Sequence, residues 1–493
     1  MIYHRLLDGN LTMRALAFEL QICILLAAVI LLGTECGLAA PPRPNLAILL
    51  ADDLGYGDLG CYGHAHIRSR HIDRFAGQGI RFTDCYAAAP MCSPSRAGLL
   101  TGRSPHRTGI FDWIAHDGST QLHLRREETT FAQLLQTVGY QTALHGKWHL
   151  NSRFNSPEQP QPGDHGFEYW FATQFNPPHL NPSGFVRNGE TLPSQEGYSC
   201  QVVANDAISW LREQRDTERP FFQFISFHEP HHPIKSPPNL VSRHLGTSTD
   251  NEKEAIYFAN VENLDDAVGN YLNALGKLGL AENTLVIFTS DHGPQTRGKG
   301  VFKHSYGQTG GLRGRKRHLW EGGIRVPAMV RWPAAIEPGD DETPVGFVDV
   351  LPTFATLTGY AIPDDRPLDG TDLTPLFRGE LVERETPLHW HFYSPLSGPQ
   401  SVLREGPWCI TGSWDVGTAP FAAGTRHIPS FQETIRRAAV RDFQLYNLSD
   451  DLAQQRDVAH KHPEIKNRLA AKLARLQREV RDEAPTWSEN NTP

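Results

Sequence analysis

Two pairs of polar residues have the type and placement that a bound metal ion requires. Asp52 and Asp53 follow one apolar run, and Asp291 and His292 follow another. Adjacent carboxylates offer the hard oxygen ligands that Ca²⁺ and Mg²⁺ prefer, whereas imidazole is a softer ligand. Each pair alone is equally typical of a solvated loop, but together they predict a split site for one divalent cation.

Cys92 begins a segment with the features of a helix N-terminus. The sequence from this residue reads CSPSRAGLLTG, in which Pro94 suits the first turn of a helix and Gly102 ends the run. A cysteine at this position lies where anions are stabilised, and Arg96 adds a cation nearby. The residues alone leave open a second interpretation, a buried structural cysteine at the start of a helix.

Further candidates follow two other apolar runs. The run 140–144 leads into Lys147 and His149, and the run 221–227 leads into His228. Lys316 lies in a segment rich in glycine and basic residues. Taken singly, each of these residues is also typical of a surface cation or of a histidine that is hydrogen-bonded inside the fold.

The apolar runs predict the elements that position these groups. We expect buried strands at 45–50, 140–144, 221–227 and 285–290, with helices at 127–138 and 252–277. Near-continuous apolar strands that alternate with helices indicate a largely parallel α/β sheet covered on both faces. Ligands bind at the carboxyl ends of such strands, and the polar residues fall there.

The pattern changes near residue 385. Shorter strand-like pieces at 389–393, 408–410 and 443–446 precede an amphipathic helix predicted at 463–481. We therefore expect a catalytic domain over 41–384 and a smaller α+β subdomain over 385–493, with a small antiparallel sheet and a terminal helix.

Composition excludes several classes of protein. The chain has 493 residues, 39% of them hydrophobic, and its 47 Lys and Arg against 55 Asp and Glu give a net charge of −8. A globular chain without a basic block is not typical of a nucleic-acid binder. An anionic substrate would need a local basic site.

The N-terminus resembles a secretion signal. The apolar run 22–32 is followed by small residues up to Ala40, so we predict a signal peptide over 1–40, with Met13 as an alternative start. The run is too short to span a bilayer, although an N-terminal anchor is the alternative. We expect an exported protein, periplasmic, secreted or lumenal, with no stable membrane span after removal of the leader. Five cysteines would remain, an odd number that leaves at least one thiol unpaired.

The segment that begins at Cys92 resembles the signature of the type I, formylglycine-dependent sulfatases, nearest to the arylsulfatase A and N-acetylgalactosamine-6-sulfatase branch. Other matching segments occur in the same order along the chain: DDLGYGDLGCYG (52–63), GKWHL (146–150), SDHG (290–293), GLRGRKRHLWEGGIRVP (311–327) and FQLYNLSDD (443–451). The resemblance implies an alkaline-phosphatase-like fold, with a large, mostly parallel mixed sheet between helices.

The resemblance also implies a cofactor and a ligand set. Cys92 would be oxidised to formylglycine by a formylglycine-generating enzyme. Asp52, Asp53, Asp291 and His292, with residue 92, would bind Ca²⁺, or Mg²⁺ as the alternative. His292 departs from the asparagine of many relatives, and because imidazole is a softer ligand than an amide oxygen, this residue bears on the choice of metal.

Catalytic roles follow from the same resemblance. Arg96 and Lys147 would hold the formylglycine hydrate and the sulfate, and His149 would accept a proton from the hydrate. His228 and Lys316 would lie at the leaving-group side, where His228 would protonate the departing alcohol. The expected reaction is hydrolysis of sulfate esters with the formylglycine hydrate as nucleophile.

The expected substrate is a sulfated carbohydrate, because aromatic and histidine-rich segments at 111–113, 175–179, 231–232 and 303–306 suit sugar binding. Two alternatives stay open. One is a phosphodiesterase or phosphonate monoester hydrolase on the same scaffold. The other is a catalytically silent binder of sulfated glycans, in which Cys92 is never converted.

Overall fold

The structure is a computed structural model that describes residues 43–118, 120–296, 305–416 and 428–487, without side-chain detail for 428–431. The predicted signal peptide and Met13 lie outside the described residues. Within the described ranges, no helix is both long and apolar enough to cross a membrane.

The main sheet has ten strands. In spatial order they are β11 (Gly339–Asp341), β2 (Ile80–Phe82), β10 (Ala328–Arg331), β9 (Thr284–Ser290), β1 (Asn45–Asp52), β8 (Phe221–Pro230), β4 (Gln141–Lys147), β5 (Tyr169–Thr173), β6 (Val186–Arg187) and β7 (Glu190–Thr191). The central strands β9, β1, β8, β4 and β5 are parallel, and β10, β6 and β7 pair antiparallel with their neighbours. A separate two-stranded parallel sheet joins β3 (Cys85–Tyr86) to β12 (Val345–Gly346).

Helices flank this sheet. They are α2 (Arg70–Ala76), α3 (Cys92–Thr101), α4 (Phe131–Thr137), α5 (Ser199–Glu213), α6 (Pro238–Val241), α7 (Glu252–Lys277), α8 (Glu321–Ile324), α9 (Val350–Thr358), α10 (Ile428–Arg437) and α11 (Pro463–Glu483). Short 3-10 helices occur at Gly60–Tyr62, Pro162–His165, Phe347–Asp349 and Leu376–Arg378. The helix predicted at 127–138 begins later, because Thr130 caps α4 through a capping box.

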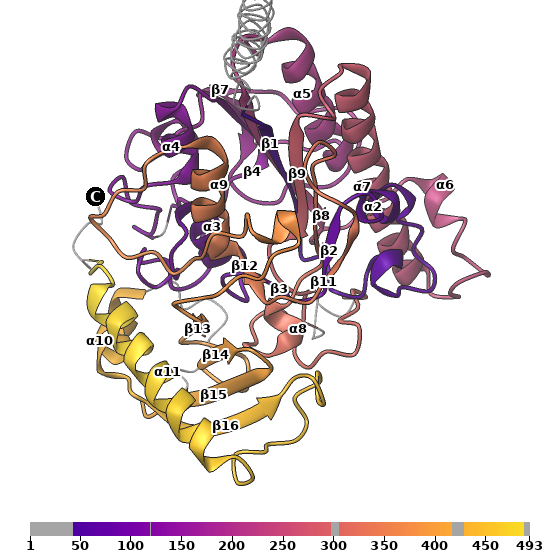
Figure 1. Cartoon of the computed structure of the whole chain (residues 1–493). Helices are drawn as coiled ribbons and strands as arrows, with labels where there is room; N and C mark the ends of the chain where they lie inside the picture. Colours follow the sequence, from indigo (N-terminus) through magenta and orange to yellow (C-terminus); the bar gives the residue numbers. More distant parts are fainter. Residues whose placement is uncertain (1–42, 119, 297–304, 417–427, 488–493) are drawn as a thin grey trace, which may run out of the picture. The chain divides into compact units, whose positions relative to one another are not determined.

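The two faces of β1 show why helices cover the main sheet on both sides. Even-numbered residues from 46 to 50 pack into one hydrophobic cluster with residues of α3, α4 and α9. Odd-numbered residues from 47 to 51 pack into a second cluster with residues of α2, α5 and α7. Successive side chains of a strand point to opposite faces, so a continuous apolar run requires cover on both sides, as Figure 1 shows. The predicted α/β class and the alkaline-phosphatase-like, mostly parallel mixed sheet are confirmed.

Three central strands extend further than their apolar runs. β1 includes Asp52, β4 includes Lys147 and β8 continues to Pro230. Backbone pairing does not depend on side-chain polarity, and β1 pairs with β8 as far as Asp52 and Pro230. The polar groups therefore belong to the strand ends themselves, which holds them more rigidly than loops would.

A four-stranded antiparallel sheet forms the C-terminal part. It contains β13 (Leu388–His391), β14 (Ser401–Glu405), β15 (Trp408–Trp414) and β16 (Val440–Asn447), with α11 packed against it. Strand β14 has no counterpart among the predicted segments. The smaller antiparallel sheet and terminal helix are as expected, and both sheets lie in one compact unit that begins at Pro44.

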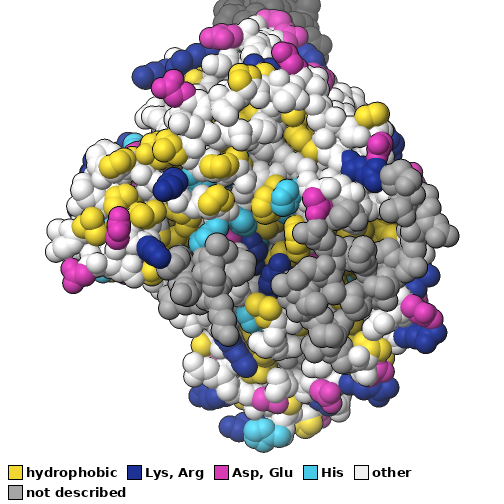
Figure 2. All heavy atoms as spheres, turned by 180° about the vertical axis from the view of Figure 1, so that it is seen from behind, with side chains coloured by type: hydrophobic (Ala, Val, Ile, Leu, Met, Phe, Trp, Pro, Cys, Tyr) yellow, Lys and Arg dark blue, Asp and Glu magenta, His cyan; other side chains and the backbone are white. Residues whose placement is uncertain are grey.

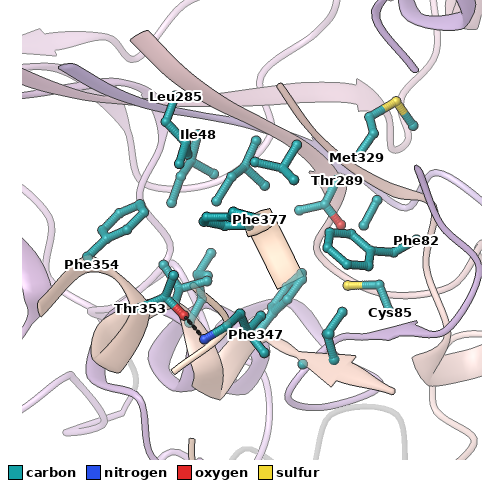
Figure 3. A pocket seen from close by; sticks show the side chains of 18 residues that line it. Ile48, Phe82, Cys85, Leu285, Thr289, Met329, Phe347, Thr353, Phe354 and Phe377 are labelled. Carbon is teal, nitrogen blue, oxygen red and sulfur yellow. Dashed lines mark hydrogen bonds between the residues drawn. The ribbon is translucent and has the colours of Figure 1, made fainter. Parts of the chain in front are cut away.

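An apolar cavity of about 60 Å³ lies between the sheet and the segment 345–377. Ile48, Phe82, Met329 and Phe354 line it together with the thiol of Cys85 (Figure 3). None of the predicted site residues lines this cavity, and its wall offers no charged group for a sulfate ester. Its apolar lining therefore does not suit a sulfate ester.

Candidate active site

Groups from three elements meet where β1, β9 and α3 come together. Asp52 ends β1, Cys92 begins α3, and His292 follows β9. One ligand atom from each of Asp52, Asp53, Cys92 and His292 lies within 4.8 Å of the other three, and all four residues are buried. The expectation that these distant segments converge is therefore matched by the geometry.

Asp291 also lies in this region but is directed toward Arg96. Its Oδ2 accepts hydrogen bonds from Nε and Nη2 of Arg96, at 3.2 and 3.0 Å. Its Oδ1 accepts one from the backbone N–H of Asp53 at 3.2 Å. Nη1 of the same guanidinium donates to Ser226 Oγ and to the carbonyl of Lys147, at 2.5 and 3.2 Å. Arg96 thus ties three parts of the site together.

Two lysines neutralise the paired carboxylates. Lys147 donates a hydrogen bond to Asp52, and Lys316 donates one to Asp53 at 2.7 Å. Nζ of Lys316 also lies 3.6 Å from the sulfur of Cys92. Both lysines are buried, so the surface-cation interpretation does not hold for either.

The backbone bends sharply beside these groups. Asp53 and His149 have φ values of 66° and 58°, and Arg317, next to Lys316, has 68°. Left-handed conformations are uncommon for residues other than glycine and cluster at functional sites. Gly146 has a φ of 98°, and a Cβ there would lie 1.9 Å from the carbonyl oxygen of Ser226. Only glycine lets β4 approach β8 this closely just before Lys147.

The donor set fits a divalent cation. Asp53 Oδ2 is buried and accepts no hydrogen bond from the described residues. Nδ1–H of His292 donates to the carbonyl of Gly293 at 2.9 Å, which directs Nε2 toward Asp53 Oδ1, 3.4 Å away. Fixing a histidine through its other ring nitrogen is typical of metal sites. Burial lowers the pKa of His292, but the Asp291 and Cys92 charges outweigh it and raise the pKa to about 9 without a metal.

The charges around Cys92 favour the ionised form of its thiol. Burial raises the pKa of its thiol, but the charges of Lys147 and Lys316 outweigh burial and lower the pKa to about 7. The sulfur is 3.2 Å from Nε2 of His292 and 3.7 Å from Oδ1 of Asp52. This surrounding would stabilise a developing negative charge on any group at position 92.

His149 offers one free ring nitrogen. Its Nε2–H donates to the carbonyl of Ile114 at 3.0 Å, and its Nδ1 has no hydrogen-bond partner among the described residues. Burial and the nearby Lys147 hold the pKa of this histidine well below its usual value. A neutral imidazole with an unprotonated Nδ1 can accept a proton.

His228 and His231 lie in different surroundings. His228 is fully buried, and both of its ring nitrogens are engaged, Nε2 with Thr173 Oγ1 at 2.8 Å and Nδ1 with Ser199 Oγ at 2.7 Å. His231, three residues later, points Nε2 toward Asp53 Oδ2 at 3.7 Å. The expected role of His228 at the leaving-group side stays a prediction, and His231 is a second candidate for that side.

Figure 2 shows histidine side chains beside hydrophobic, Lys and Arg side chains near the middle of one face. Mixed apolar and basic surroundings suit a ligand that has both an anionic and an apolar part.

The model of the sulfatase family matches residues 44–360, which is most of the chain and contains every residue of the site described above. The chain belongs to the sulfatase family. Its members are sulfuric ester hydrolases, and this chain is one of them.

Curated relatives of this sulfatase support the assignment. It is 34% identical to steryl-sulfatase of Rattus norvegicus over 75% of its own length and 76% of that protein. It is 35% identical to human arylsulfatase A over 71% of each chain. N-acetylgalactosamine-6-sulfatase of Rattus norvegicus is 32% identical, with 76% of this chain and 74% of that protein covered.

Solved structures agree on the fold of the sulfatase. A complex of Ps i-CgsB with k-i-k-neocarrahexaose superposes with a TM-score of 0.74 at 23% identity, covering 91% of this chain and 96% of that chain. A Bacteroides thetaiotaomicron structure, BT33336S-sulf, from work on the metabolism of multiple glycosaminoglycans, has a TM-score of 0.71 at 26% identity. It covers 89% of this chain and 99% of that one.

Proposed function

We propose that this sulfatase hydrolyses the sulfate esters of a carbohydrate, with formylglycine made from Cys92 and one bound divalent cation, Ca²⁺. The observation that carries the proposal is that Cys92 lies, buried, beside metal-binding groups and beside two lysines that are hydrogen-bonded to the paired carboxylates. The carboxylates of Asp52, Asp53 and Asp291 are balanced by the cations Arg96, Lys147 and Lys316. A bound divalent ion would therefore give the site a net positive charge, which suits a sulfate anion.

When bound, the cation would polarise a sulfate oxygen, and the modified residue 92 would supply the attacking oxygen. Asp52, Asp53, Asp291 and His292 would hold the cation together with residue 92. Arg96 would fix Asp291 and Lys147, as its hydrogen bonds favour.

Lys147 and Lys316 would offset the charge that develops on the sulfuryl oxygens, since both are buried cations beside position 92. His149 would accept a proton at its unpartnered Nδ1. The proton for the departing alcohol needs a donor whose nitrogen faces the site, and the orientation of His231 favours it over His228 for this role.

The carbohydrate part of the proposal rests on the aromatic and histidine side chains beside the site and on the names of relatives. The name of N-acetylgalactosamine-6-sulfatase refers to a sulfated sugar, and one similar structure holds D-glucosamine-2-N,6-O-disulfate as its substrate. The name of steryl-sulfatase refers to another class of substrate, the sterol sulfates. A panel of defined sulfated monosaccharides, oligosaccharides and a sterol sulfate, assayed for sulfate release, decides between these classes.

The maturation of the chain completes the proposal. Three further parts of the proposal rest on the sequence alone. They are removal of residues 1–40 during export, conversion of Cys92 by a formylglycine-generating enzyme, and a C-terminal subdomain that begins at residue 385. N-terminal sequencing of the protein from its native host tests the first of these. Limited proteolysis near residue 385 tests the last.

Peptide mass spectrometry and paired assays test the function itself. In protein from its native host we expect the peptide containing residue 92 to lack its sulfur atom, and aryl sulfate to be hydrolysed with a higher kcat/KM than aryl phosphate. Cys92→Ser should fold and bind metal but should not turn over repeatedly, because a serine has no second hydroxyl to expel the sulfate. An unmodified Cys92, or faster phosphate hydrolysis, would overturn the proposal.

A further inference from the structure

Phe175 borders three of the side chains assigned to the reaction. Nζ of Lys147 lies 5.2 Å from the centre of its ring. The ring meets the imidazoles of His149 and His231 nearly edge-on, with ring centres 5.0 and 5.7 Å apart. The function proposed above gives Phe175 no task, although its side chain is the apolar neighbour that these groups share.

The aromatic surface continues outward from Phe175. The imidazole of His116 stacks on the ring at 4.7 Å with an angle of 2° between the planes. His116 is exposed and Phe175 is half-buried, so the pair reaches from the catalytic side chains to solvent. An alcohol that leaves the sulfate next to His231 would lie against this pair.

A chain of hydrogen bonds fixes the backbone of Phe175. The hydroxyl of Thr173 donates to the carbonyl of Phe175 at 2.8 Å. Thr173 Oγ1 must then accept from Nε2–H of His228, at 2.8 Å. Nδ1 of His228 in turn accepts from the hydroxyl of Ser199, at 2.7 Å. Each donor in the chain has one acceptor, which defines the tautomer of His228 as neutral with the proton on Nε2.

We infer that Phe175 and His116 form the wall of the leaving-group subsite and contact the apolar face of a sugar ring, and that His228 is a positioning residue that holds this wall through Thr173. The inference rests on the proposed function and deepens it. The C–H groups of a pyranose pack against an aromatic wall, while its hydroxyls reach the imidazoles around it. His228 was a candidate because it lies near a strand end. In this assignment, the residue at that position supports the wall and does not transfer a proton.

The wall is tested by substrate selectivity. Phe175→Leu keeps most of the bulk and removes the ring. We expect kcat/KM to fall roughly three- to tenfold for a sulfated monosaccharide and to stay within twofold for an acyclic alkyl sulfate, as an aromatic contact of ordinary strength predicts. Phe154→Leu, which removes a ring packed against Trp170 instead, should keep the wild-type ratio.

Three results would overturn the wall. Equal losses on both substrates would mean that Phe175 acts only on Lys147 and the imidazoles. Wild-type kcat/KM on both substrates would mean that no sugar touches the ring, and a loss on an aryl sulfate alone would assign the wall to another class of substrate. A wild-type enzyme that releases no sulfate from any ester would instead refute the proposed function.

The positioning role is tested with matched variants. Thr173→Val breaks the hydrogen-bond chain and should shift the selectivity ratio in the same direction as Phe175→Leu, whereas Thr173→Ser keeps the hydroxyl and should restore it. His228→Gln retains an N–H donor at the place of Nε2 and should preserve turnover and the pH–rate profile. If His228→Gln instead lost turnover on alkyl and sugar sulfates but kept activity on aryl sulfate, His228 would be the proton donor. That result would overturn the assignment.

Discussion

Nζ of Lys316 lies 2.7 Å from Oδ1 of Asp53, a residue 263 positions earlier in the chain. The pair joins the strand end that carries the candidate metal ligands to the segment that carries a candidate sulfate-binding cation. A cation that binds to Asp53 therefore also changes the ion pair between Asp53 and Lys316.

Lys316→Met should reduce kcat by about 10²-fold or more, because it removes a buried charge beside the reacting atoms. Steady-state assays with an aryl sulfate, combined with circular dichroism to verify folding, measure this. A folded Lys316→Met enzyme with kcat within threefold of wild type would contradict the assigned role.

A chelator should lower the thermal stability of the protein, and Ca²⁺ should restore it. An ion at one hundred times its dissociation constant adds about 2.7 kcal/mol to the free energy of unfolding. Asp53→Asn should abolish most of the response, because it removes a buried carboxylate whose Oδ2 accepts no hydrogen bond from the described residues. Asp250→Asn, on an exposed residue, is the control and should respond like wild type. Differential scanning fluorimetry with Ca²⁺ and Mg²⁺ also decides which ion is preferred.

His231→Ala should slow hydrolysis of alkyl and sugar sulfates by roughly 10²- to 10⁴-fold, as expected for loss of a general acid. Aryl sulfates with an acidic leaving phenol should be affected much less, since their leaving groups need no proton. The neighbouring His232→Ala is the matched control. Similar losses on both classes of ester would argue for a binding role for His231 instead.

Asp369 should contribute to stability in a pH-dependent way. Burial raises the pKa of its carboxyl, but the hydrogen bond with His389 and the charge of Arg107 outweigh burial and hold the pKa well below its usual value. Because the pKa is lower in the folded than in the unfolded chain, the ionised group stabilises the fold fully above about pH 5, and this contribution disappears as the pH falls further.

Asp369→Asn should therefore cost about 3–5 kcal/mol near neutral pH and flatten the loss of stability below pH 5. Urea unfolding at a series of pH values measures both effects. Asp365→Asn, which removes a surface pair with Arg366, should leave the curve unchanged. Parallel curves for wild type and Asp369→Asn would show that Asp369 does not titrate in this range.

Much of the sheet could be predicted because its strands are apolar on both faces. A run such as Leu46–Ala51 must be buried on two sides, and the polar residues after it must lie at one edge of the sheet. The position of Cys92 at the start of α3 could also be predicted, because Pro94 suits the first turn of a helix. Strand β14 was missed because its residues, SVLRE, alternate too briefly to stand out.

The choice between His228 and His231 could not be made from sequence. Both occur within the segment HEPHH, and which ring faces the site depends on where β8 ends, which backbone pairing with β1 decides. The stacking of His116 on Phe175 joins loops 59 positions apart, and no local pattern predicts such a contact. Residue types could identify the chemistry, but orientation required the tertiary structure.

The burial of α3 has a consequence for biogenesis. All ten residues of this helix are buried, and Cys92 exposes 2% of its surface. A modifying enzyme could not reach that side chain in the finished fold. If Cys92 becomes formylglycine, its conversion must come before α3 packs, so the chain acquires its nucleophile while still unfolded, and a molecule that folds first is permanently inactive.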